Sequence, residues 1–367
     1  MKSQEKIKNI CSKFFIYGDF MVAVPYGNGN INDTFQVTFD QGGSRIRYIL
    51  QRINSNVFKN PPQVMENIDR ITQHLLRKIR HEPIGGKRRT LRFLRSFSDY
   101  PYAQDDDGDF WRATIFIENA RSYEVLENEE QAFNVAKAFG QFTGDLSDLP
   151  GERLHEIIPD FHDTPKRLDA LELAAKEDRV GRAKEVGAEV EFALKRREET
   201  GILLELQKNS DIPERITHND TKANNVLIDD LTGEGVCVID LDTVMPGLAL
   251  YDFGDMVRSG CNPAEEDEVN LDNVYMKFSM FEAMLRGYWD SCGSSLTEAE
   301  KQYLPFSGKL ITLEIGTRFL TDYLNGDTYF KTKRPSHNLE RCRNQFKLVE
   351  SMEQQMDKMN ILAQRLK

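Results

Sequence analysis

The chain has 367 residues, of which 40% are hydrophobic and 29% are charged. This length exceeds one ordinary hydrophobic core, so we expect two packed lobes. The 48 Lys and Arg residues against 59 Asp and Glu residues give a net charge of −11, which argues against nucleic acid as the main partner. The sequence has no apolar run of membrane-spanning length, and its first residues lack the apolar core of a secretion signal. We therefore predict a cytoplasmic protein without a membrane partner.

The first third of the chain alternates in the manner of β-strands. MVAVPYGNGNINDTFQVTFD (21–40) has apolar residues near every second position on both sides of a glycine loop, and a GGS turn precedes RIRYILQRIN. NPPQVMENIDRITQHLLRKIR then places apolar residues at three- and four-residue steps after two prolines, which predicts a helix. TLRFLRSF and FWRATIFIEN flank an acidic loop and predict another hairpin. We assign residues 1–120 to this first lobe.

From residue 121 onward the periodicity is mostly helical, and we assign residues 121–367 to a second lobe. Late in this lobe, Glu314, Arg318 and Asp322 lie at successive i+4 steps and so share one helix face. Spacing alone favours an intrahelical salt-bridge ladder for these three side chains.

A concentrated polar stretch, THNDTKANNVLID (217–229), runs into a predicted strand. The segment VLIDDLTGEGVCVID predicts a hairpin, and a symmetric turn would place Asn225 opposite Asp240, with Asp220 in the loop just before it. Opposed residues of antiparallel strands lie about 4.5–5.5 Å apart. Converging carboxylate and amide oxygens suit Mg²⁺, which keeps water and phosphates in its other positions. The stretch therefore predicts a phosphate-bearing metal site.

The spacing gives a second indication. Residues 218–225 reproduce the H-x-D-x-x-x-x-N pattern of kinase catalytic loops, and Asp240 stands where the metal-binding aspartate of those enzymes follows the hairpin. The sequence resembles the phosphotransferase family of aminoglycoside and choline kinases. This resemblance implies an α+β, bilobal protein kinase-like fold, with a small antiparallel-sheet lobe and a larger, mainly helical lobe. It also implies that ATP and Mg²⁺ bind in the cleft between the lobes.

Further stretches, among them YGNGNINDTFQV, VIDLDTVMPGLALYDFGD and LPFSGKLITLEIGTRFLTDYLNGDTYF, resemble the family members that phosphorylate N-acetylhexosamines. This resemblance implies transfer of the γ-phosphate of ATP to the C1 hydroxyl of N-acetylglucosamine or N-acetylgalactosamine, with a sugar 1-phosphate as product. Choline, an aminoglycoside, homoserine and methylthioribose are alternative acceptors. A third hypothesis is a catalytically inactive nucleotide-binding scaffold.

The motif assigns roles to five residues. Asp220 would be the base that accepts the proton of the attacking hydroxyl. Asn225 and Asp240 would hold Mg²⁺, and Asp242 would reach a second ion if the strand stayed extended beyond Asp240. Lys222 would neutralise the transferring phosphate, and a solvated lysine is the alternative.

The residues around this loop have supporting roles. The resemblance implies that His218 packs and holds the loop rather than taking part in the chemistry. We expect Asp252 and Asp255 to brace the catalytic loop. The resemblance also implies that Arg318 and Tyr329 contact the sugar, whereas a cationic acceptor would need an acidic or aromatic box.

The glycine loop of the first lobe is the predicted phosphate-binding loop. Gly27, Asn28 and Gly29 form a turn between two strands, where residues without a Cβ let backbone N–H groups approach phosphates. Asn30 follows them and is a further candidate for a phosphate or sugar contact.

The lysine that pairs with ATP phosphates in related kinases is missing from RYILQRIN. Arg52, or less favourably Gln51, would supply that contact, since arginine grips phosphate with two N–H groups. Glu66 on the following helix is a candidate partner for Arg52, and an exposed helix charge is the alternative. Residues 117–119, with Glu118 at the centre, resemble the hinge whose backbone binds adenine.

Overall fold

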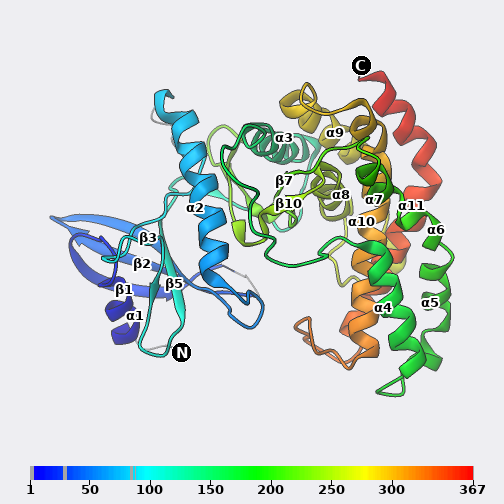
Figure 1. The fold of residues 1–367 in the computed structure, drawn as a ribbon, viewed down its shortest axis with the longest axis horizontal. Coiled ribbons are helices and arrows are strands. Elements are labelled where there is room, and N and C mark those ends of the chain that lie inside the picture. Colours follow the sequence, from blue (N-terminus) through cyan, green and yellow to red (C-terminus); the bar gives the residue numbers. More distant parts are fainter. Residues whose placement is uncertain (1–3, 28–30, 83–85, 87, 367) are drawn as a thin grey trace.

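The computed structural model describes residues 4–27, 31–82, 86 and 88–366. It confirms an α+β fold in which an antiparallel sheet with two helices stands beside a larger helical part (Figure 1). The sheet has the strand order β1-β2-β3-β5-β4, and its pairings are antiparallel. The elements of this part are α1 (Gln4–Cys11), β1 (Asp19–Pro25), β2 (Asp33–Gln41), β3 (Ser44–Arg52), α2 (Pro61–Lys78), η1 (Ile79–His81), β4 (Ala103–Gln104) and β5 (Phe110–Ile115).

Helix α1 covers one face of the sheet. Its Ile7 packs with Leu50 and Trp111 in a hydrophobic cluster made of α1 and sheet residues. Successive side chains of a strand point to opposite faces, so Gln51 and Arg112, which lie opposite each other on β3 and β5, project from the other face. The sheet therefore has an apolar face toward α1 and a polar face on its other side.

Helix α2 belongs to a different core from the sheet. Its Met65 and Ile68 lie in the same hydrophobic cluster as Val135 and Phe253 of the helical part. The helix begins as the sequence predicts, with two prolines in its first turn and the side chain of Asn60 accepting a hydrogen bond from the N–H of the third residue. Figure 1 shows α2 standing between the sheet and the helical part.

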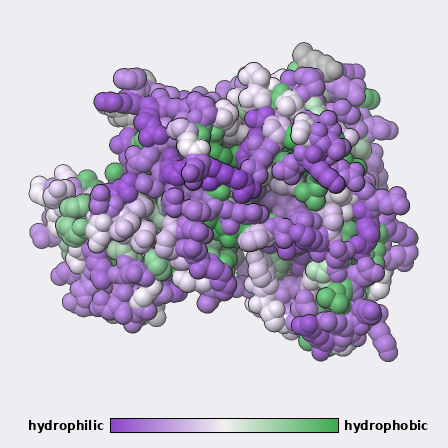
Figure 2. Space-filling view, in the orientation of Figure 1, coloured by the Kyte–Doolittle hydropathy of each residue, from purple (hydrophilic) through white to green (hydrophobic). Residues whose placement is uncertain are grey.

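The helical part surrounds a short β-hairpin and a two-stranded pair. Hydrophilic residues cover most of the face shown in Figure 2, with small separate hydrophobic patches. Within the described residues, no helix has both the length and the apolarity that crossing a membrane requires. The helices are α3 (Glu129–Asp145), α4 (Thr164–Glu177), η3 (Ala183–Glu185), α5 (Gly187–Leu194), α6 (Arg197–Thr200), α7 (Ile202–Lys208), η4 (Ala223–Asn225), η5 (Leu241–Thr243), α8 (Ala249–Gly260), η6 (Leu271–Asn273), α9 (Phe278–Cys292), α10 (Glu298–Leu324) and α11 (His337–Arg365).

The predicted hairpin is present as β8 (Val226–Asp229) and β9 (Gly235–Val238), and β6 (Ala120–Arg121) pairs with β8. The predicted register was wrong by one residue. Beside the turn Ile228 pairs with Gly235, two positions from the prediction, and the bulge between Leu227 and Ile228 recovers one of the two. The carbonyl of Asn225 therefore accepts from the N–H of Ile239 (2.9 Å) instead of lying opposite Asp240. Both residues nevertheless lie at the open end of the hairpin.

The second predicted hairpin is confirmed only as a short antiparallel contact between its two segments, where Phe93 pairs with Thr114. The segment TLRFLRSF (90–97) forms no named strand and joins its neighbours through isolated bridges, of Ser96 with Phe14 and of Phe93 with Thr114. The acidic loop that follows forms only the two-residue strand β4 before β5. The division of the chain at residue 120 stays a prediction.

The packing of α3 against α9 depends on Gly287. A Cβ at this position would lie 2.2 Å from the carbonyl oxygen of Phe133 on α3. We expect Gly287→Ala to lower the free energy of unfolding by about 1–3 kcal/mol, because the two helices must separate to admit the methyl group. Denaturant titration followed by circular dichroism measures this loss.

Gly144 provides the matched control. It lies on α3, and the nearest atom to an added Cβ there is 3.7 Å away, an ordinary contact. Gly144→Ala should leave the stability unchanged or raise it by about 0.5–1 kcal/mol, since alanine favours a helix over glycine. Equal unfolding midpoints for the two alanine variants would contradict the steric argument.

Candidate active site

The catalytic loop, residues 218–225, is held by α8. The carboxylate of Asp252 accepts the backbone N–H groups of His218 (2.8 Å) and Asn219 (2.7 Å), and its carbonyl accepts the hydroxyl of Thr221 (2.6 Å). Burial is the largest influence on Asp252 and raises its pKa to about 6. The two bonds confirm that Asp252 braces the loop. Asp255 instead binds Arg258 of its own helix (2.7 Å).

His218 packs, as the resemblance implied. Its side chain is fully buried, and its ring meets those of Phe139 and Phe142 edge-on, with centroids 5.4 and 6.0 Å away. The Nε2 atom lies 2.9 Å from the carbonyl oxygen of Ile239, and Nδ1 accepts the N–H of Asp220 (3.3 Å). This assigns the ring hydrogen to Nε2 and ties the loop to the end of the hairpin.

The structure brings Asp220, Lys222 and Asn225 together. The Lys222 ammonium lies 3.0 Å from Asp220 Oδ1, and Asn225 Nδ2 donates to the carbonyl of Asp220 (2.8 Å) and to Oδ2 (3.3 Å). Burial acts to raise the pKa of Asp220, but the charge of Lys222 opposes it and the net shift is downward. Asp220 is therefore a carboxylate at neutral pH.

Asp240 lies beside this group in a left-handed conformation (φ 59°) at the end of β9. Its side chain reaches solvent although protein atoms surround it closely. Desolvation, with Asp242 and Asp220 as further causes, raises its pKa to about 6. Among the described residues its carboxylate has no hydrogen-bonding or ionic partner.

The donor set at this point fits Mg²⁺. The side-chain oxygen of Asn225 accepts no hydrogen bond from the described residues, since the amide nitrogen makes the bonds to Asp220. Within the part of the chain described, no group of three acidic, His or Cys side chains is arranged to hold a metal. Asp240 and Asn225 would thus supply two ligands and leave other positions to water and phosphate oxygens.

Asp242 does not continue the strand, contrary to our expectation. The left-handed turn at Asp240 leads into η5, so the two side chains do not share an extended face. Both oxygens of Asp242 instead bind the guanidinium of Arg112, Oδ2 at 3.0 Å from Nη2, and Asn32 also donates to Oδ2 (2.5 Å). The carboxylate is 3% exposed. Its partners are protein donors, which does not favour a metal-binding role.

Arg52 also lies elsewhere than predicted. Alternation along β3 turns its side chain away from the face of Gln51, and it binds Asp33 of β2 (2.8 Å) and Asp109 in the loop before β5 (3.2 Å). Glu66 pairs with His155 (2.8 Å) and not with Arg52. The structure therefore does not bring Arg52 and Glu66 together as a substitute for the missing lysine pair.

The predicted phosphate-binding loop, residues 27–30, is described only at Gly27. Gly27 has φ 75°, and a Cβ there would meet open space, while Asn28, Gly29 and Asn30 lie outside the described residues. In the predicted hinge, the carboxylate of Glu118 binds Arg47.

The backbone of the hinge is also partly occupied. The carbonyl of Glu118 accepts from Arg88 (2.9 Å), and that of Asn119 accepts from the N–H of Asp230 (3.0 Å). The backbone of Ile117 makes no hydrogen bond within the described residues. Among the described residues, the N–H groups of Glu118 and Asn119 make no hydrogen bond either, so the predicted hinge has free backbone groups for a base.

The face of α10 predicted as a salt-bridge ladder has other partners. Buried Glu314 binds His162 Nδ1 (2.9 Å) and Thr164 (2.7 Å). Asp322 accepts the backbone N–H groups of residues 328–330 at 2.8–2.9 Å. Arg318, between them, has no hydrogen bond or ion pair with any described residue.

The guanidinium of Arg318 lies instead among aromatic rings. It is 5.1 Å from the ring centre of Phe161, 5.9 Å from that of Tyr329 and 5.7 Å from that of Phe330. A series of ring contacts leads from this cation toward the residues that hold the catalytic loop. The ring of His162, next to Phe161, contacts Tyr251 (4.8 Å), the neighbour of Asp252 in the chain.

Two residues of the site were missed by the sequence reasoning. Arg112 lies in a segment that predicts only a strand, and its one signal is a charge within an apolar run. His162, which has an unpartnered buried Nε2, carried no signal because its partner Glu314 is 152 positions away. Asp163, next to it, caps α4 by accepting the N–H of Lys166 (3.1 Å).

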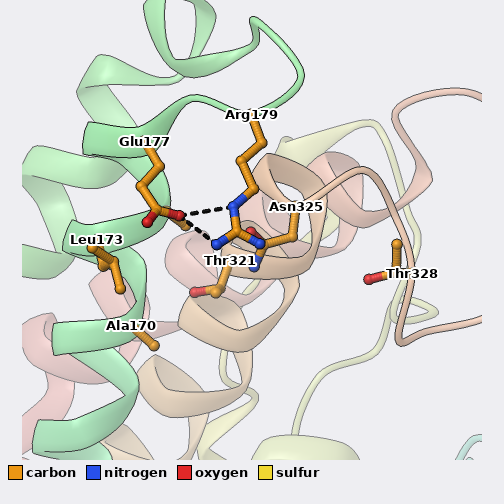
Figure 3. A pocket seen from close by; sticks show the side chains of 8 residues that line it. Ala170, Leu173, Glu177, Arg179, Thr321, Asn325 and Thr328 are labelled. Atoms are coloured by element: carbon orange, nitrogen blue, oxygen red, sulfur yellow. Dashed lines mark hydrogen bonds and ion pairs between the residues drawn. The ribbon is translucent and has the colours of Figure 1, made fainter.

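A surface pocket of about 400 Å³ lies between α4 and the end of α10 (Figure 3). Glu177 and Arg179 form an ion pair on its wall (2.8 Å), which Figure 3 shows as dashed lines. None of its lining residues comes from the catalytic loop or the hairpin, and we assign it no part in the site. The lining residues are Ala170, Leu173, Ala174, Glu177, Arg179, Thr321, Asn325 and Thr328.

Solved structures of several phosphotransferases are similar to this chain over nearly its whole length. An aminoglycoside phosphotransferase from Alicyclobacillus acidocaldarius is 14% identical, with TM-score 0.60 over 98% of this chain and 96% of that one. Spectinomycin phosphotransferase in complex with ADP and spectinomycin is 13% identical, with TM-score 0.59 over 96% and 99%. Choline kinase from Cryptosporidium parvum is 15% identical, with TM-score 0.55 over 97% of each chain. Because the pattern of the phosphotransferase enzyme family matches residues 22–273, more than half of the sequence, the chain belongs to that family.

Proposed function

We propose that the protein is an ATP-dependent kinase of N-acetylhexosamines that phosphorylates the C1 hydroxyl and releases a sugar 1-phosphate. The observation that carries the acceptor is Arg318, a cation without an ionic partner among the described residues, surrounded by aromatic rings. One of these rings, Phe161, contacts His162, which contacts Tyr251 next to Asp252. Support for the nucleotide comes from the family and from solved relatives in complex with ADP and GDP.

The proposed roles follow from the contacts. Asp220, ionised and held by the loop, accepts the proton of the attacking hydroxyl. Lys222 lies 3.0 Å from it and offers positive charge to the transferring phosphoryl group. Asn225 and Asp240 would hold Mg²⁺, which when bound neutralises phosphate charge.

The positive charge of Arg318 favours a neutral acceptor over a cationic one. A cationic acceptor such as choline or an aminoglycoside would meet the unpaired Arg318, whose charge repels it. The nearby carboxylates are not free to bind such a cation directly, because Glu314 is hydrogen-bonded to His162 and Thr164, and Asp322 to backbone N–H groups. A neutral sugar with hydroxyl and acetamide oxygens can accept hydrogen bonds from the free guanidinium N–H groups, and its apolar face can lie against the rings.

Transfer from ATP and Mg²⁺ to N-acetylglucosamine, N-acetylgalactosamine, glucose, choline and kanamycin tests the proposal, with the linkage read by phosphorus NMR. We expect phosphate at C1 of an N-acetylhexosamine. Asp220→Asn should lower kcat by roughly 10²- to 10⁴-fold, since a base in the transition state contributes that much. Transfer to choline or kanamycin alone would contradict the acceptor and leave the kinase activity. Absence of any transfer, with nucleotide still bound, would favour the inactive scaffold.

Substitution of Arg318 tests the acceptor side separately. We expect Arg318→Gln to raise KM for the sugar roughly 10- to 100-fold, the range for losing a hydrogen bond to a charged group, while KM for ATP stays unchanged. Arg179→Gln is the control, because Arg179 forms an exposed ion pair with Glu177 (2.8 Å) and should change neither constant by more than about twofold. An unchanged sugar KM in Arg318→Gln would remove Arg318 from the acceptor site.

A further inference from the structure

The cleft face of the sheet has no lysine on β3, although transfer of a phosphoryl group depends on positive charge near the phosphates. Gln51, on the cleft side of β3, is neutral. Arg52 is turned away and bound to Asp33 and Asp109. Apart from Lys222 of the catalytic loop, a cation from the sheet would therefore have to come from a strand other than β3.

Arg112 on β5 lies directly beside the gap. It is the register partner of Gln51, and its Nε donates to Gln51 Oε1 (3.0 Å). Both oxygens of Asp242, two residues beyond Asp240, hold the two terminal nitrogens of the guanidinium. The guanidinium of Arg112 is thus held by Gln51 of the sheet and by Asp242 in the segment that follows the hairpin.

We propose that Arg112 is the cation that binds the nucleotide phosphates in place of the missing lysine, and that Asp242 and Gln51 orient it for this contact. The inference rests on the proposed use of a nucleotide and is independent of the acceptor. It also gives Asp242 a role that is different from metal binding.

The hydrogen bonds of Arg112 leave room for such a contact. A guanidinium has five N–H donors. Gln51 takes one, Asp242 takes two, and the sulfur of Met65 lies 4.0 Å from Nη1. One N–H of Nη2 has no acceptor among the described residues.

The charge of Arg112 is strong at this position because the side chain is 2% exposed and little screened by water. It lies close enough to Asp240 to counter the rise in the pKa of that carboxyl. Arg112 and Lys222 are therefore two cations near Asp240, each bound to a different neighbouring carboxylate.

The test compares the affinities of the intact chain for adenosine, AMP and ADP by calorimetry, without added metal. Arg112→Gln alone would leave Asp242 as a buried, unpaired charge and risks unfolding. The informative variant is therefore Arg112→Gln combined with Asp242→Asn, in which two neutral amides replace the ion pair. We expect it to bind ADP roughly 10- to 100-fold more weakly than the wild type and adenosine equally well.

Arg52→Gln is the matched control, since it removes an arginine from the adjacent strand position that faces away, and its ADP affinity should stay within about twofold of the wild type. A folded double variant with wild-type ADP affinity would overturn the proposal and leave Arg112 as a purely structural ion pair. If the double variant does not fold, the wild type decides: affinity must rise from adenosine to ADP, and equal affinities overturn the proposal. Failure of the wild type to bind any adenine nucleotide would instead contradict the proposed function.

Discussion

The carboxylate of Asp252 determines the shape of the catalytic loop. The backbone N–H groups of His218 and Asn219 each donate to one of its two oxygens. Asn219 itself adopts a left-handed conformation. A further bond from Thr243 to the carbonyl of His218 (2.7 Å) fixes the loop to the turn that follows Asp240. The positions of the proposed base and of the proposed metal ligands are thus set by hydrogen bonds to the backbone, which vary less than contacts between long side chains.

Charge is distributed unevenly around this loop. Asp220 and Asp242 each have a cation, Lys222 and Arg112, whereas Asp240 has none among the described residues. Burial raises the pKa of Asp240, and the charges of Asp242 and Asp220 raise it further. A divalent cation bound at Asp240 would balance the one carboxylate of the three that lacks a positive partner. This charge balance supports a metal site there independently of any resemblance.

The features predicted well from the sequence are those determined by neighbouring residues. The loop motif, the hairpin and the capped start of α2 depend on spacing within a few positions. The register of the hairpin was wrong because its turn is centred earlier than between residues 232 and 233, so Ile228 pairs with Gly235, and the bulge recovers only one of the two positions. Asp242 was misplaced because a left-handed residue ends the strand, and its partner Arg112 is 130 positions away. The helical spacing of Glu314 and Arg318 was correct, but tertiary partners outcompeted the i+4 pairing.

The separate core of the sheet and α1 has a consequence for sequence variation. The cluster that contains Leu50 and Trp111 includes no residue of α2 or of the helices that hold the catalytic loop. Changes of side-chain volume in that cluster are accommodated within the sheet and α1, so they need not displace Asp252 or the loop. The small sheet can accumulate compensating core substitutions as a unit, while the helical part retains its geometry.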